Sequence, residues 1–254
     1  MLFALTNGCL EVRAIALSLA FILSATSLPA ADINDLSQDR QLQLVIARYA
    51  HAIQMQQNAM KGAQMEVDID GSLPKLEKHG KLRVLRIVSM LGEITFKPLA
   101  AFSGDQTVFK ELIARYLSEE QQKKAYGAMN VSPAVYEFKP KAILTEQAGT
   151  LEAHTVYVFE VQPHHSGPGL FRGEVRIDGA TGMPLREAGQ LVENPHFMLK
   201  KVRFARDYEL VDGISVLKHM ESTADVRLFG PAQLDIEFSN FTRLPEESTL
   251  AGGF

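Results

Sequence analysis

Apolar residues alternate with charged ones over much of the second half of the chain. Between Phe171 and Ile177 every second residue is apolar or glycine, and every residue in between is charged. A period of two predicts a β-strand with one face buried and the other in water. Similar alternation, or apolar runs bounded by turn residues, predicts further strands at 65–70, 81–90, 93–99, 136–144, 155–161, 201–210, 214–228 and 234–238.

Most of these predicted strands are joined by short segments rich in turn residues. The run from Asp178 to Pro184 is dense in turn residues, Asp212-Gly213 is a hairpin signal, and Gly230-Pro231 predicts a tight turn. Residues 71–80 are expected to form a polar loop. Because the connections are short, neighbouring strands are predicted to be antiparallel.

Two segments have the three- and four-residue spacing of amphipathic helices instead. The first is predicted at residues 35–60, where Asp35 and Gln38 resemble a capping box. The second is predicted to begin near Asp105, a suitable N-cap, and to end by Gly127. The first helix is expected to dock on the sheet. A membrane-surface helix is the alternative, but its polar face is rich in glutamine where such helices have Lys and Arg.

These elements predict an α+β fold. A long antiparallel sheet with one apolar face curls to cover that face, and the two amphipathic helices are available to fill the concave side. We therefore expect a curved sheet, or incomplete barrel, of about 10–11 strands that clasps two or three helices. No linker divides the chain after the N-terminal segment, so residues 32–250 are predicted to be one domain.

The N-terminal segment, residues 1–31, has the features of a signal peptide. Arg13 precedes an apolar run of about twelve residues, shorter than the roughly 20 that span a bilayer. Cleavage is expected after Ala30 or Ala31, which implies export to the periplasm; a retained membrane anchor is the alternative. Because the residues before Arg13 fit poorly, Val12 is an alternative start to Met1. Cys9 precedes the apolar run, which disfavours a lipoprotein.

Composition narrows the classes of function. The formal net charge of −4 argues against a nucleic-acid partner, and the single cysteine excludes a disulfide framework. Phosphate loops, dinucleotide fingerprints and metalloprotease motifs are absent from the sequence, and the segment after Gly213 lacks the second glycine of a nucleophile elbow. The chain is therefore predicted to be no enzyme and to need no cofactor.

Two clusters of polar residues have alternative interpretations. His164 and His165, with His154 nearby, are residues of a type that binds metals. Adjacent residues of a strand point to opposite faces, however, so we expect a solvated loop and no metal site. The basic residues near 200 either steer acidic lipid headgroups or a partner, or form the wet face of the sheet. These basic residues are Lys200, Lys201, Arg203 and Arg206.

The region from Thr155 to Phe241 resembles bacterial periplasmic proteins of the outer-membrane lipoprotein-sorting type. The resemblance rests on segments 156–161, 170–178, 200–204 and 234–238, and on the Ile177-Asp-x-x-Thr-Gly-x-Pro184 hairpin. This hairpin resembles one in the wider LolA/LolB-like superfamily, which includes lipoprotein carriers and periplasmic sensors that restrain anti-sigma factors.

The resemblance implies a half-barrel whose apolar interior accepts acyl chains. The expected partner is then a lipid or a lipidated protein, and association with membranes is peripheral at most. The alternative is an envelope-stress sensor or interaction module that binds an envelope protein on the same scaffold. The residues predicted to line the cavity, or else simply to form the core, are Phe171, Val175, Ile177, Phe204, Tyr208, Ile236 and Phe238.

Overall fold

The computed structural model of the chain describes residues 30–122, 131–146, 154–194 and 199–243. Most of the predicted signal peptide, and the alternative starts Met1 and Val12, lie outside these residues. Helix α1 (Ala30–Ala59) begins at the predicted cleavage region and covers the helix predicted at 35–60 except for its last residue. Among the described residues, no helix is both long and apolar enough to cross a membrane.

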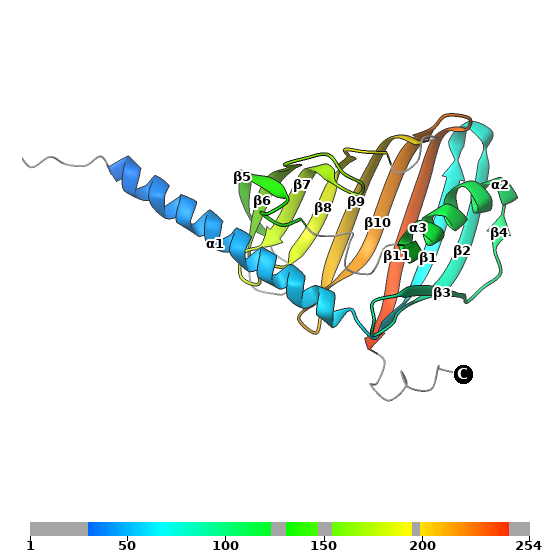
Figure 1. The fold of residues 1–254 in the computed structure, drawn as a ribbon, viewed down its shortest axis with the longest axis horizontal. Coiled ribbons are helices and arrows are strands. Elements are labelled where there is room, and N and C mark those ends of the chain that lie inside the picture. The colour runs from blue at the N-terminus through cyan, green and yellow to red at the C-terminus, as the bar shows by residue number, and fades with distance from the viewer. Residues whose placement is uncertain (1–29, 123–130, 147–153, 195–198, 244–254) are drawn as a thin grey trace, which may run out of the picture.

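One antiparallel sheet of 11 strands forms the body of the protein (Figure 1). Its main path runs β3-β2-β1-β11-β10-β9-β8-β7-β6-β5, with β4 paired to β2. The strands are β1 (Ala63–Leu73), β2 (Lys78–Val88), β3 (Ile94–Pro98), β4 (Ser103–Gly104), β5 (Tyr136–Glu146), β6 (His154–Pro163), β7 (Phe171–Asp178), β8 (Pro184–Leu191), β9 (Leu199–Val211), β10 (Ile214–Val226) and β11 (Gly230–Arg243).

The order of the strands follows the sequence except at one place. From β5 to β11 each strand pairs with the next one along the chain, as the short turns predict. β1 instead pairs with β11, for example Ile69 with Ile236, which joins the first strand of the chain to the last. The path is open because β3 and β5 lie at its two ends. The predicted α+β fold, an incomplete barrel with helices on one face, is confirmed.

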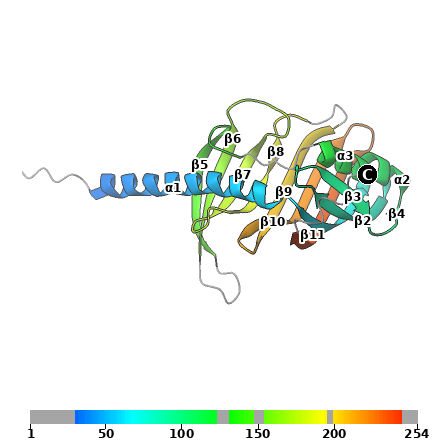
Figure 2. The same ribbon diagram turned by 60° about the horizontal axis from the view of Figure 1, so that its bottom comes forward.

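Two helical segments cover one face of the sheet, which we call the inner face (Figures 1 and 2). α1 crosses the half that contains β5 to β8, and its buried residues Val45, Tyr49 and Ile53 recur at the spacing predicted for an amphipathic helix. The second segment consists of α2 (Gln106–Val108), a π-helical turn η2 (Phe109–Ile113) and α3 (Ala114–Gln122), and it covers the other half. Its predicted N-cap is confirmed, since the Asp105 carboxylate accepts a hydrogen bond from the Thr107 N–H at 2.7 Å.

Two predicted turns are wrong in their positions. Residues 71–80 form no long loop: β1 and β2 pair through Leu73 and Lys78, and only the short helix η1 (Pro74–Leu76) and one further residue separate them. Gly71 and Gly80 resemble turn residues in the sequence, yet they are small inward-facing strand residues. A Cβ on Gly71 would lie 2.9 Å from Val108, so glycine gives the α2 segment room. Likewise Gly230-Pro231 begins β11 and is not a turn.

Candidate binding face and the buried polar cluster

The seven residues predicted to line a cavity all lie on the inner face, but they belong to two separate regions. Phe171, Val175 and Ile177 are buried beneath α1, and Phe204 packs against them. Ile236 and Phe238 are buried in a second core beneath the α2–α3 segment. Tyr208 lies on β9, which separates these regions. Their role in binding a ligand stays a prediction.

A group of buried polar side chains lies on the inner face next to Tyr208. Glu187 of β8 is 0% exposed, and its Oε2 accepts a hydrogen bond from the Tyr208 hydroxyl at 3.0 Å. The Arg206 guanidinium lies 3.6 Å from the same Glu187 oxygen and stacks 4.6 Å from the centre of the Phe204 ring. Tyr49 of α1 is fully buried and close enough for the Glu187 charge to affect it. We call Tyr49, Glu187, Arg206 and Tyr208 the buried polar cluster.

The cross-strand register places the charged pair of this cluster. Glu187 is directly opposite Arg206 on neighbouring strands, and Arg206 is directly opposite the buried Met220 on the next one. Both charged residues therefore face inward. In the sequence, Arg206 occupies a position of β9 where the alternation calls for an apolar residue. Its inward orientation could therefore be inferred from the sequence. Glu187 had no such signal, because the prediction assigned no strand to residues 184–191.

Charges from the α3 side of the inner face also reach the cluster. Arg86 of β2 lies 3.9 Å from Glu120 of α3, and both side chains are mostly buried. Burial by itself would lower the pKa of Arg206, but the nearby Tyr208, Glu187 and Glu120 together raise it. Arg206 is therefore a permanent cation between the two helical segments.

Burial raises the pKa of Glu187, although Arg206 and Tyr208 act in the opposite direction. Between the ordinary and the raised pKa, the folded protein therefore holds a proton that the unfolded chain has already released. This contribution to stability is complete below the ordinary Glu pKa of about 4.3 and is lost as the pH rises through the raised pKa.

We expect the variant Glu187→Gln to lack this pH dependence. The difference in free energy of unfolding between the variant and the wild type should shift in favour of the variant as the pH rises from about 4 to about 8. Urea unfolding at a series of pH values measures the difference. A constant difference across this range would show that Glu187 titrates at its ordinary pKa.

Four buried polar atoms of the described residues make no hydrogen bond of ordinary geometry, and two of them belong to α1. They are the Tyr49 hydroxyl, Gln56 Oε1, Glu187 Oε1 and Arg206 Nε. Gln56 does anchor α1 through its other amide atom, since its Nε2 donates to the Ser215 carbonyl at 2.6 Å. Each unpaired buried group costs about 1–3 kcal/mol. The C-terminal half of α1 therefore packs on the sheet with polar atoms buried but not hydrogen-bonded.

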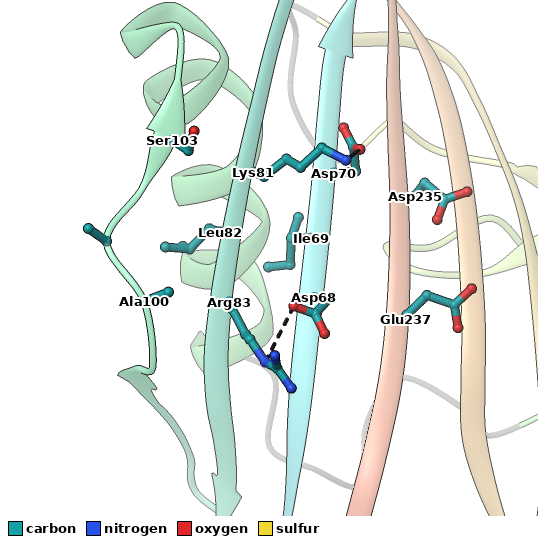
Figure 3. A pocket seen from close by; sticks show the side chains of 11 residues that line it. Asp68, Ile69, Asp70, Lys81, Leu82, Arg83, Ala100, Ser103, Asp235 and Glu237 are labelled. Atoms are coloured by element: carbon teal, nitrogen blue, oxygen red, sulfur yellow. Dashed lines mark ion pairs between the residues drawn. The ribbon is translucent and has the colours of Figure 1, made fainter.

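The opposite, outer face of the sheet has a different character. A groove of about 520 Å³ lies there between β1, β2 and β11 on one side and Ala100–Ser103 on the other (Figure 3). Its surface carries Asp68 opposite Glu237 and Asp70 opposite Asp235, with Lys81 paired to Asp70 at 2.6 Å. His219 lies beside this groove, with its ring 3.3 Å from Asp235. Burial lowers the pKa of His219, but the Asp235 carboxylate raises it, and the net shift is upward. These are exposed charged groups typical of a solvated sheet face.

The two groups of polar residues noted in the sequence, the histidines and the basic residues near 200, form no common site in the structure. His164 and His165 are exposed in a loop, as expected, and the His164 ring lies 3.3 Å from the Pro133 carbonyl. The basic group near residue 200 is not one cluster. Arg206 is turned inward, whereas Lys200, Lys201 and Arg203 are exposed.

Comparisons with known proteins give distant structural likenesses only. No protein-family model matches it, and no curated protein matches it either. A solved LolA superfamily protein from Nitrosomonas europaea is 10% identical, with 78% of this chain and 94% of that chain covered and a TM-score of 0.41. A putative outer membrane lipoprotein-sorting protein domain from Vibrio parahaemolyticus is 13% identical over 78% and 94%, with a TM-score of 0.40.

A DUF1329 family protein from Desulfovibrio piger is 12% identical, with 81% of this chain and 96% of that chain covered and a TM-score of 0.38. Two of the three likenesses are to proteins described as of the type that the sequence resembles. They concern the course of the chain alone and carry no argument about its site.

Proposed function

We propose that this chain is a non-enzymatic periplasmic binding protein whose inner face accepts the acyl chains of a lipid or a lipidated protein. The inner face is apolar on both sides of the buried polar cluster, and separate helical segments cover it. An acyl chain that replaces such a helix on the sheet gains about 0.8 kcal/mol of binding free energy for each methylene that it buries. This binding requires no catalytic group.

The observation that carries the proposal is a set of four buried polar atoms, two on α1 and two on the sheet, that make no hydrogen bond of ordinary geometry. In the described arrangement these atoms are excluded from water. When α1 moves off the sheet, water can reach them, and this gain offsets part of the apolar surface that becomes exposed. α1 is therefore a cover that can be displaced at a lower cost than its apolar stripe alone would suggest.

Displacing α1 would uncover a surface suited to an acyl chain. Phe159, Val175 and Ile177 are fully buried beneath it and come from two adjacent strands. They form a strip of branched and aromatic side chains that a flexible hydrocarbon can cover. The Arg206 guanidinium and Glu187 carboxylate at the edge of this strip would face the polar end of the ligand.

We expect purified, exported protein to bind cis-parinaric acid saturably, as measured by its fluorescence. The variant Tyr49→Phe should bind this probe about 5-fold more weakly, because removal of one unpaired buried hydroxyl stabilises the docked α1 by about 1 kcal/mol. The same variant should unfold at a higher temperature. Tyr116→Phe, on α3, serves as the matched control and should leave the affinity for the probe unchanged.

The absence of saturable probe binding by the wild type would contradict the proposal and favour the scaffold for an envelope protein. Equal affinities of Tyr49→Phe and wild type, with saturable binding in both, would contradict the role of α1 as the displaced cover. Mass spectrometry of a solvent extract adds a second readout, in which fatty material is expected to co-purify.

A further inference from the structure

Two neighbouring hairpin turns at one end of the sheet each expose a leucine directly after a cationic residue. Lys75-Leu76 lies in the turn between β1 and β2, and Arg227-Leu228 lies in the turn between β10 and β11. Leu228 is 74% exposed and Leu76 is 42% exposed. Exposed apolar side chains that lie next to one another can mark an interaction site.

The two turns form one continuous surface. The aliphatic part of Lys75 lies across the start of β11, since a Cβ on Gly230 would be 2.5 Å from Lys75 Cδ. Each turn is closed by a backbone hydrogen bond of 3.2 Å, from Glu77 N–H to the Pro74 carbonyl and from Phe229 N–H to the Val226 carbonyl. Both turns lie at the same end of the sheet because β1 pairs with β11 (Figure 1).

The beginning of β9 adds further cations to this end. Lys200 is directly opposite Asp225, close to the β10–β11 turn, and Lys201 follows it. Lys75, Arg227, Lys200 and Lys201 are all exposed there, against the carboxylates of Glu77 and Asp225. The four exposed cations outnumber these two carboxylates, although the whole chain has a formal net charge of −4.

We propose that this end of the sheet docks on an anionic lipid bilayer. We call it the leucine tip and define it as Lys75, Leu76, Arg227 and Leu228, with Lys200 and Lys201 beside them. The two leucines enter the boundary between headgroups and acyl chains, and the cations remain among the lipid phosphates. Exposed leucines flanked by cations are the combination by which proteins bind at the interface of an anionic membrane.

This docking is independent of ligand binding at the inner face, because the leucine tip shares no residue with the buried polar cluster. It also gives the exposed lysines near residue 200 a function that the inner face does not use. A protein that exchanges acyl chains with a membrane would be held there with one end of its sheet at the surface.

The experiment is co-sedimentation of the protein with sucrose-loaded vesicles. Wild type should bind vesicles of phosphatidylcholine with about one third phosphatidylglycerol, and binding should fall at high salt. The double variant Leu76→Ser/Leu228→Ser should partition at least about 10-fold more weakly. The double variant Lys75→Gln/Arg227→Gln should also bind more weakly and lose much of the salt dependence.

Leu91→Ser is the matched control, because Leu91 is 80% exposed in the turn between β2 and β3, at the opposite end of β2. This variant should bind vesicles as the wild type does. Equal partitioning of the leucine double variant and the control would overturn the proposal. So would a wild type that binds no vesicles, a result that favours a protein partner for this surface. Neither result affects the test with cis-parinaric acid.

Discussion

The variant Arg206→Ala is expected to lower the free energy of unfolding by about 3 kcal/mol or more at neutral pH. Glu187 is 0% exposed, and Arg206 is the cation closest to it among the ion pairs of the described residues. Removing the guanidinium leaves a buried carboxylate without its counter-charge, which is among the most costly changes a single substitution makes. Urea unfolding followed by circular dichroism measures the loss.

Replacing both charged residues by apolar ones shows whether the instability of Arg206→Ala comes from an unpaired charge or from lost packing. We expect Glu187→Leu/Arg206→Met to be close to the wild type in stability, or above it, because well-packed apolar residues can replace a buried ion pair. The loss in Arg206→Ala should also shrink at acidic pH, where Glu187 becomes neutral. A double variant as unstable as Arg206→Ala would show that the side-chain volume of Arg206 matters and its charge does not.

The variant Gly173→Ala is expected to destabilise the protein by about 3 kcal/mol, a fall in melting temperature of about 6–12 °C. Gly173 and Gly189 face each other across β7 and β8. A Cβ on Gly173 would lie 2.0 Å from the Ala188 carbonyl oxygen, and this backbone atom cannot move without breaking the pairing. Thermal unfolding followed by circular dichroism checks the value.

The matched control for this prediction is Gly167→Ala. A Cβ there would lie 3.2 Å from Leu170 Cδ1, the end of a flexible side chain. We expect this variant to stay within about 0.5 kcal/mol of the wild type. If both alanine variants are equally stable, close packing at the glycine pair does not constrain the sheet.

The glycine pair also explains how aromatic side chains fit on the inner face. A Cβ on Gly189 would lie 2.7 Å from the Phe171 ring, so the missing side chain makes room for that ring. Phe171 then meets Phe204 edge to face, with ring centres 5.0 Å apart. Both phenylalanines were predicted as inner-face residues from their alternation, but no local pattern showed that they touch.

Features set by neighbours in the sequence were predictable from it. The alternation in β7, the hairpin at Asp212-Gly213 and the N-cap at Asp105 all depend on interactions within a few residues. Their periodicity and turn chemistry therefore sufficed to predict an antiparallel sheet with helices on one face. The same reasoning failed at residues 71–80, where glycines that accommodate a distant helix resemble the glycines of a loop.

Which residues face inward on most of the predicted strands, and where several of the turns lie, follow from side-chain alternation and turn chemistry, which are local properties. The pairing of β1 with β11, the contact of Glu187 with Arg206, and the position of Leu76 and Leu228 at one end of the sheet arise only in the folded chain. Such pairings depend on register between segments far apart in the chain. They are selected by the free energy of the whole packed sheet and leave no periodic trace in the segments themselves.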